Sequence, residues 1–221
     1  MTADELPRAD AVSVADLPSP DLRTLYREPA KGAMDKVVDH VGPAAAAFIA
    51  QSPLLVMATG DGSGLDASPR GGPPGFVRVL GPSTLAFGDL VGNNRLDSYA
   101  NLRANPAVGL IFFVPGAEET VRVNGTAVVT DDETVRAACE LDGRVPRVAV
   151  VIAVEQCYLH CGAALRRARL WDQESWPEAI PSGGEILAEA VGAHGAAEAI
   201  DADLAAYYDN AVWELGGTES T

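Results

Sequence analysis

The residues best suited to chemistry lie between Asp66 and Pro106, where an Asn-Asn-Arg loop precedes a short segment of helical character. Arg95 ends that loop, and the amide groups at a helix N-terminus carry partial positive charge. An arginine beside such a terminus is a natural seat for a phosphate group. A surface ion pair is the alternative interpretation of Arg95 in this position. The strands before the loop could form a wall for a ring, so the pattern suggests a phosphorylated cofactor.

Arg70 follows Pro69 in a predicted strand, and a buried guanidinium there requires a partner. A ligand anion and a carboxylate on a neighbouring strand both fit this requirement. The segment from Gly71 to Gly75 is either a tight crossover or a place where the backbone approaches a cofactor, because glycine has no Cβ. His160 is interpreted as a structural histidine in preference to a general acid, so no catalytic residue is assigned.

The order of predicted elements indicates a mainly β fold. Six or so short strands joined by hairpins suggest a small antiparallel barrel with helices at its edges and at the termini. Predicted strands cover residues 54–59, 66–70, 76–80, 84–89, 108–114, 120–129 and 148–155. Predicted helices cover residues 33–40, 43–51, 94–104, 131–141, 161–169 and much of 185–215. Leu96 and Leu102 are expected to face the core, and Trp171 and Trp176 to pack in the core or at a dimer contact.

Composition excludes several classes of partner. The chain has 221 residues, a net charge of −15 and two lysines, Lys31 and Lys36. The acidic excess argues against nucleic acid and against an anionic membrane, and no apolar run is long enough to span a bilayer. Three cysteines without framework spacing indicate a reduced cytoplasm. No metal is expected, because Cys157, His160 and Cys161 lack a second paired cluster; both cysteines are interpreted as buried thiols.

Several short motifs together resemble the FMN-binding split-barrel family named for pyridoxamine 5′-phosphate oxidase, and most closely its bacterial FMN-dependent flavoproteins of unassigned substrate. The similarity runs from about residue 22 to residue 176. The motifs are Ser68-Pro-Arg-Gly71, Pro74-Gly-Phe-Val-Arg78, Gly92-Asn-Asn-Arg-Leu-Asp-Ser98, Asn105-Pro106, Thr120-Val-Arg-Val-Asn-Gly125, His160-Cys161 and Leu170-Trp-Asp172. The resemblance implies an antiparallel, Greek-key-like split barrel that forms a homodimer, with FMN between the subunits.

The resemblance also implies a set of cofactor contacts. Ser68, Arg70 and Gly71 would lie along the strand that faces the flavin, and Asp89 would follow on the next strand. Asn94 and Arg95 match the family's phosphate-binding loop. Thr120 would come from the opposite subunit. Apart from the resemblance, Arg167 lies in a basic helix end, where it either reaches the cofactor groove or complements the dipole of its own helix.

These inferences predict three regions: an N-terminal arm and helix (residues 1–42), a split barrel (43–176), and a helical extension (177–221) that packs on the barrel or the dimer partner. The expected function is an FMN-dependent oxidoreductase that transfers hydride through flavin N5 to an unidentified small molecule. The oxidase's C-terminal substrate motif has no counterpart here, so pyridoxamine phosphate oxidation is not implied. The alternatives are a flavin-binding protein without turnover, or a split barrel that holds F420 or haem.

Overall fold

The computed structural model describes residues 17–90 and 92–211, and the chain divides by its contacts after Asp35. The part before this division contains two short exposed helices, α1 (Leu22–Leu25) and α2 (Lys31–Asp35). The Asp21 side chain caps α1 by accepting a hydrogen bond from the Arg23 amide. The predicted extended arm lies partly outside the described residues, since residues 1–16 are not among them.

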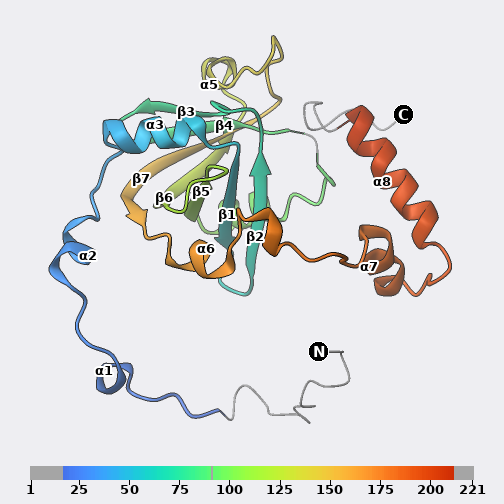
Figure 1. The fold of residues 1–221 in the computed structure, drawn as a ribbon. Helices are drawn as coiled ribbons and strands as arrows, with labels where there is room; N and C mark the ends of the chain where they lie inside the picture. Colours follow the sequence, from blue (N-terminus) through green and yellow to red (C-terminus); the bar gives the residue numbers. More distant parts are fainter. Residues whose placement is uncertain (1–16, 91, 212–221) are drawn as a thin grey trace. The chain divides into compact units, whose positions relative to one another are not determined.

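The second part is built on one seven-stranded sheet in which every neighbouring pair is antiparallel (Figure 1). Its strand order is β2-β1-β5-β6-β7-β4-β3. The chain crosses between distant strands of the sheet from β2 to β3 and from β4 to β5, which gives the predicted Greek-key-like connectivity. The strands are β1 (Leu54–Gly60), β2 (Leu65–Gly71), β3 (Val77–Gly81), β4 (Thr84–Gly88), β5 (Ala107–Phe113), β6 (Thr120–Thr130) and β7 (Ala149–His160).

One hydrophobic core joins strands from both halves of this sheet. Leu55 and Met57 on β1 belong to the same buried cluster as Val77 on the edge strand β3 and Val150 on β7. Strands far apart in the sheet order can share a core only if the sheet curls. The edge strands β2 and β3 are not paired with each other. The predicted fold class, a mainly β split barrel with flanking helices, is therefore confirmed.

Helices cover the barrel and extend the chain beyond it. Helix α3 (Pro43–Gln51) inserts Ile49 into the core, and α4 (Asp97–Ala104) inserts Leu102. The remaining helices are α5 (Glu133–Ala138), α6 (Ala163–Ala168), the 3₁₀ turn η2 (Gln173–Ser175), α7 (Gly183–Ala190) and α8 (Ala197–Ala211). Within residues 17–90 and 92–211, no helix is long and apolar enough to cross a membrane.

Helices α7 and α8 form a hairpin that is joined by one carboxylate. Asp201 on α8 accepts hydrogen bonds from the Gly184 amide (2.7 Å) and the Ser182 hydroxyl (2.6 Å), both at the start of α7. Ser182 and Glu185 add a reciprocal capping box. The predicted helical extension is thus present with its break, but its predicted last residues, 212–215, lie outside the described residues.

Strand β7 is longer than predicted because it continues to His160. Its pairing with β6 continues past a β-bulge. At the bulge the register shifts between Asn124 and Gly125, and Glu155 has no partner on β6. A Cβ at Gly125 would lie 2.0 Å from the Ala153 carbonyl oxygen, so only glycine fits at this bulge.

Several local predictions are wrong. The predicted helix over residues 33–40 ends at Asp35, because Val38 instead pairs with Cys157 through two backbone hydrogen bonds (3.1 and 2.7 Å). Leu96 is 57% exposed and does not face the core. Cys161 is exposed where a buried thiol was expected. Trp176 is exposed as well, so of its two predicted roles the dimer contact stays a prediction.

Candidate functional site

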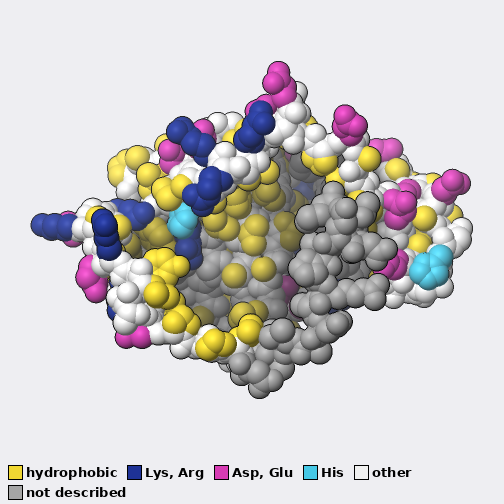
Figure 2. Space-filling model, turned by 60° about the horizontal axis from the view of Figure 1, so that its bottom comes forward, with side chains coloured by type: hydrophobic (Ala, Val, Ile, Leu, Met, Phe, Trp, Pro, Cys, Tyr) yellow, Lys and Arg dark blue, Asp and Glu magenta, His cyan; other side chains and the backbone are white. Residues whose placement is uncertain are grey.

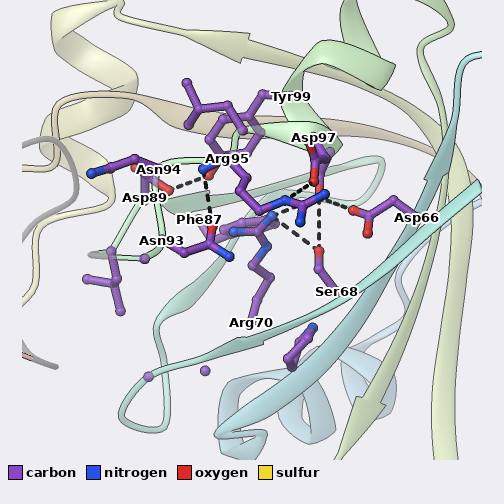
Figure 3. Close-up of a pocket in the computed structure, with 18 of the residues that line it drawn as sticks. Asp66, Ser68, Arg70, Phe87, Asp89, Asn93, Asn94, Arg95, Asp97 and Tyr99 are labelled. Atoms are coloured by element: carbon purple, nitrogen blue, oxygen red, sulfur yellow. Dashed lines mark hydrogen bonds and ion pairs between the residues drawn. The ribbon is translucent and has the colours of Figure 1, made fainter. Parts of the chain in front are cut away.

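A cavity of about 560 Å³ lies between strand β2, the end of β4 and the start of α4 (Figure 3). Its volume is in the range of small-molecule sites. Strand β2 contributes side chains at alternate positions, which share one face of the strand. The lining residues are Asp66, Ser68, Pro69, Arg70, Gly71, Gly72, Phe76, Phe87, Gly88, Asp89, Leu90, Gly92, Asn93, Asn94, Arg95, Leu96, Asp97, Ser98 and Tyr99.

A polar network connects β2 with the first turn of α4. Ser98 is buried, and its hydroxyl donates to the Asp66 carboxylate at 2.5 Å. The same hydroxyl oxygen accepts from Arg70 Nη2 at 2.9 Å and lies 2.9 Å from Ser68 Oγ. Arg70 Nη2 also donates to Ser68 Oγ at 3.2 Å. These bonds hold the guanidinium at one place in the cavity wall.

Arg70 retains unused bonding capacity. Its guanidinium carbon lies 5.3 Å from the centre of the Tyr99 ring, which is within the range of a cation–π contact. Its Nε is buried and has no hydrogen-bond partner among the described residues. A buried N–H without an acceptor costs free energy. An anionic ligand in the cavity would supply the missing acceptor, so Arg70 fits a phosphorylated or otherwise anionic cofactor.

Asp89 and Tyr99 form a second polar pair in the same cavity. The Tyr99 hydroxyl donates to Asp89 Oδ1. Burial raises the pKa of Asp89 above its ordinary value, and the hydrogen bond from Tyr99 and the charge of Arg70 oppose that rise. Burial and the neighbouring carboxylate together raise the pKa of Tyr99. The pair can therefore hold a proton at the cavity wall.

The Asn-Asn-Arg loop takes an unusual backbone path. Asn94 and Leu96 have positive φ values of 57° and 60°, so α4 begins at Asp97 and not at the predicted residue 94. Left-handed residues other than glycine cost about 1–3 kcal/mol each and are concentrated at functional sites. Leu96 offers no side-chain acceptor to cap the helix. The first turn of α4 can therefore accept an anion.

Arg95 does not point freely into the cavity. Its Nε donates to Asp97 at 2.7 Å, and its side chain is 72% exposed. The structure thus contains the ion pair that was the alternative interpretation of Arg95. An exposed pair of this kind contributes at most about 1 kcal/mol, so a phosphate could compete with Asp97 for the guanidinium.

The structure brings six of the eight predicted contact residues to this cavity: Ser68, Arg70, Gly71, Asp89, Asn94 and Arg95. Thr120 and Arg167 are not among its lining residues. Thr120 is buried at the start of β6, where its hydroxyl has no partner among the described residues. Arg167 is exposed on α6. Their predicted contacts with the cofactor stay predictions.

The polar lining residues that the sequence interpretation did not assign as contacts include Asp66, Ser98 and Tyr99. Asp66 could have been found, since it shares the β2 face of Ser68 and Arg70 through the two-residue period of a strand. Ser98 and Tyr99 lie in the first turn of α4. Their role depends on where that helix starts, and the left-handed Leu96 determines this.

A second hollow of about 650 Å³ lies at the turn between β1 and β2. Its described lining contains no Lys or Arg. Its two facing amides, Asn124 and Gln156, already bond to each other at 2.9 Å. It therefore suits an anion less well than the first cavity. Among the described residues, no group of three or more His, Cys, Asp or Glu side chains could hold a metal ion.

Comparison with known proteins gives the family. No curated protein matches the chain. Solved structures similar to it include HupZ of Group A Streptococcus (18% identity, 54% of this chain and 93% of that one, TM-score 0.44). Others are a putative pyridoxamine 5′-phosphate oxidase of Lactobacillus delbrueckii (22%, 55% and 95%, 0.42) and an FMN-binding protein of Syntrophomonas wolfei (12%, 52% and 82%, 0.41).

The family model described as pyridoxamine 5′-phosphate oxidase matches residues 41–161, which is more than half of the chain. This range contains all seven strands and the whole cavity. The chain belongs to the pyridoxamine 5′-phosphate oxidase family.

Proposed function

We propose that the protein is an FMN-dependent oxidoreductase that acts on an unidentified small molecule. The observation that carries this proposal is Arg70, whose buried Nε lacks an acceptor in a cavity that also contains the uncapped start of α4. An arginine and a helix N-terminus in one cavity are the features that bind phosphate. Family membership makes FMN the phosphate-bearing ligand to test first.

Different residues of the cavity would contact different parts of the cofactor. Arg70, Asn94 and Arg95 would hold the phosphate, and the β2 segment from Ser68 to Gly71 would lie along the ring. Bound FMN would supply the redox chemistry, by exchanging a hydride with the substrate at N5.

The remaining residues would control the surroundings of the reaction. Phe76 and Phe87 are buried, with ring centres 6.4 Å apart in an edge-to-face arrangement, so they exclude water from the inner wall. Asp89 and Tyr99 would hold a proton beside the ligand. Neither of these two roles requires a nucleophilic side chain or a metal ion. This is expected for a reaction in which the cofactor carries the electrons.

We further propose that the protein works as a homodimer in the cytoplasm, with FMN between the subunits. Figure 2 shows a face on which hydrophobic side chains gather, with Lys and Arg side chains beside them. Exposed apolar patches of this kind are typical of surfaces that bind another protein molecule. In such a dimer, Thr120 and Arg167 could reach the partner's cofactor. The three cysteines are all free, which fits a reducing compartment.

A flavin-binding protein without turnover is the second candidate. One observation favours it: each carboxylate of the cavity already has a partner. Asp66 bonds to Ser98, Asp89 to Tyr99 and Asp97 to Arg95. None is left over as a separate acid or base.

The test is to purify the protein, record its visible spectrum, and titrate it with FMN and with riboflavin. Arg95→Ala should weaken FMN binding about 10-fold, the loss of one charge-assisted contact, and should leave riboflavin binding unchanged. Arg103→Ala, on α4 and outside the cavity, is the control for the loss of a nearby arginine. Failure of the wild type to bind FMN would refute the proposal. Bound FMN that no electron donor reduces would favour the second candidate.

A further inference from the structure

Ser98 lies between two opposite charges. Its buried hydroxyl joins Asp66 on one side (2.5 Å) to Arg70 on the other (2.9 Å). No ion pair within 4.0 Å connects Asp66 directly with Arg70. Half-buried opposite charges this near to each other would normally pair, because the attraction between them grows as water is excluded. The serine hydroxyl occupies the position between them.

The orientation of this hydroxyl is determined by its neighbours. An ionised carboxylate only accepts hydrogen bonds and a guanidinium only donates them. The single proton of Ser98 therefore goes to Asp66, and its two lone pairs receive Arg70 Nη2 and the Ser68 hydroxyl. Ser98 uses its whole bonding capacity, so it is held in one position.

We propose that Ser98 is a positioning residue that keeps Asp66 away from Arg70 and so leaves the charge of Arg70 available to the FMN phosphate. This inference rests on the proposed function. It explains why an arginine beside a carboxylate still has a buried Nε without a partner. A direct bidentate pair with Asp66 would have satisfied that Nε and neutralised the guanidinium.

The inference makes a distinctive prediction for Ser98→Ala. The substitution removes the hydroxyl that separates Asp66 from Arg70, and Asp66 loses the hydrogen bond that Ser98 donates to it. The carboxylate then pairs with Arg70, since a half-buried charge without a partner is unfavourable. FMN affinity should fall about 10- to 100-fold, the range for losing a charged contact. Riboflavin affinity should stay within about twofold, because riboflavin lacks the phosphate.

The decisive measurement is a rescue. Asp66→Asn in the Ser98→Ala background removes the charge that captures Arg70, so FMN affinity should return to within about threefold of the wild type. A structural role of Ser98 predicts the opposite, because the double variant has lost more native contacts than the single one. Ser98→Thr keeps the hydroxyl and should retain affinity. Circular dichroism and thermal unfolding of each variant show that it is folded.

The outcomes separate the two proposals. Wild-type protein that binds FMN, together with a folded Ser98→Ala variant of unchanged affinity, would overturn the role of Ser98 alone. A loss that Asp66→Asn does not restore would overturn it as well. If Ser98→Ala does not fold, Ser98→Gly with and without Asp66→Asn provides the same comparison. Wild-type protein that binds neither FMN nor riboflavin would overturn the proposed function and this inference with it.

Discussion

Replacing Tyr99 by phenylalanine should destabilise the protein in a pH-dependent way. The substitution removes only the hydroxyl that donates to Asp89. The ring remains, and so does its contact with Arg70 at 5.3 Å. A hydrogen bond to a charged group contributes about 1.5–3 kcal/mol, and one between neutral groups about 0.5–1.5 kcal/mol. The loss should be in the first range where Asp89 is ionised and in the second range where Asp89 is protonated.

The effect of the Tyr99 hydrogen bond on the pKa of Asp89 determines the pH range in which the stability loss becomes smaller. The Tyr99 hydrogen bond lowers the pKa of Asp89, so its extra contribution is present above that pKa and is lost as the pH falls through it. Burial holds the pKa of Asp89 above its ordinary value of 3.8. The penalty should therefore begin to decrease at a pH above 3.8.

Urea unfolding at several pH values between 4 and 7 measures this effect, with thermal unfolding as a second probe. For a chain of this size, a loss of about 1.5–3 kcal/mol lowers Tm by about 3–12 °C. Tyr158→Phe is the control, because the Tyr158 hydroxyl has no hydrogen bond to any described residue while its ring contacts Lys36 and Arg122. An equal penalty at every pH, or none at pH 7, would refute the role assigned to the pair.

Three further outcomes are expected. Phe112→Ala, at a fully buried core position, should cost about 3–5 kcal/mol in urea unfolding, whereas Leu65→Ala, 95% exposed, should change stability by less than about 0.5 kcal/mol. Gly125→Ala places a Cβ 2.0 Å from the Ala153 carbonyl oxygen and should greatly reduce the yield of folded protein; normal yield and stability would contradict the bulge geometry. In the native protein, only the exposed Cys161 should react rapidly with a thiol reagent, since burial raises the pKa of both other thiols; two or three fast thiols would contradict this.

Strand positions could be predicted from the sequence because hydrophobic periodicity is a local signal. The bounds of the strands Leu54–Gly60 and Thr84–Gly88 were predicted to within about one residue, because both segments are short apolar runs that pack in the core. The face of β2 that carries Ser68 and Arg70 follows from the same repeat. The contact residues themselves were implied by the family resemblance, and six of them lie in one cavity.

What the sequence could not reveal depends on tertiary contacts. Val38 has no local signal that it will pair with Cys157, 119 positions later in the chain. Leu96 adopts a left-handed conformation that leucine does not favour by itself. This single residue moves the start of α4 and brings Ser98 to Arg70. Thr120 was assigned by resemblance and Arg167 from its place at a basic helix end, and the contacts of both stay predictions.

The net charge of −15 is distributed unevenly, and this resolves an apparent conflict with an anionic cofactor. Residues 170–221 contain 11 acidic residues and no Lys or Arg, whereas residues 31–169 contain 14 acidic and 13 basic residues. The barrel is thus almost neutral, and salt screens exposed charges beyond about 8–10 Å. Local partners then decide whether an arginine can bind an anion. To bind a phosphate, Arg95 must break its ion pair with Asp97. Arg70 has no such pair to break, because Ser98 already separates it from Asp66. Arg70 should therefore bind the phosphate at the lower cost, even though Arg95 belongs to the more recognisable motif.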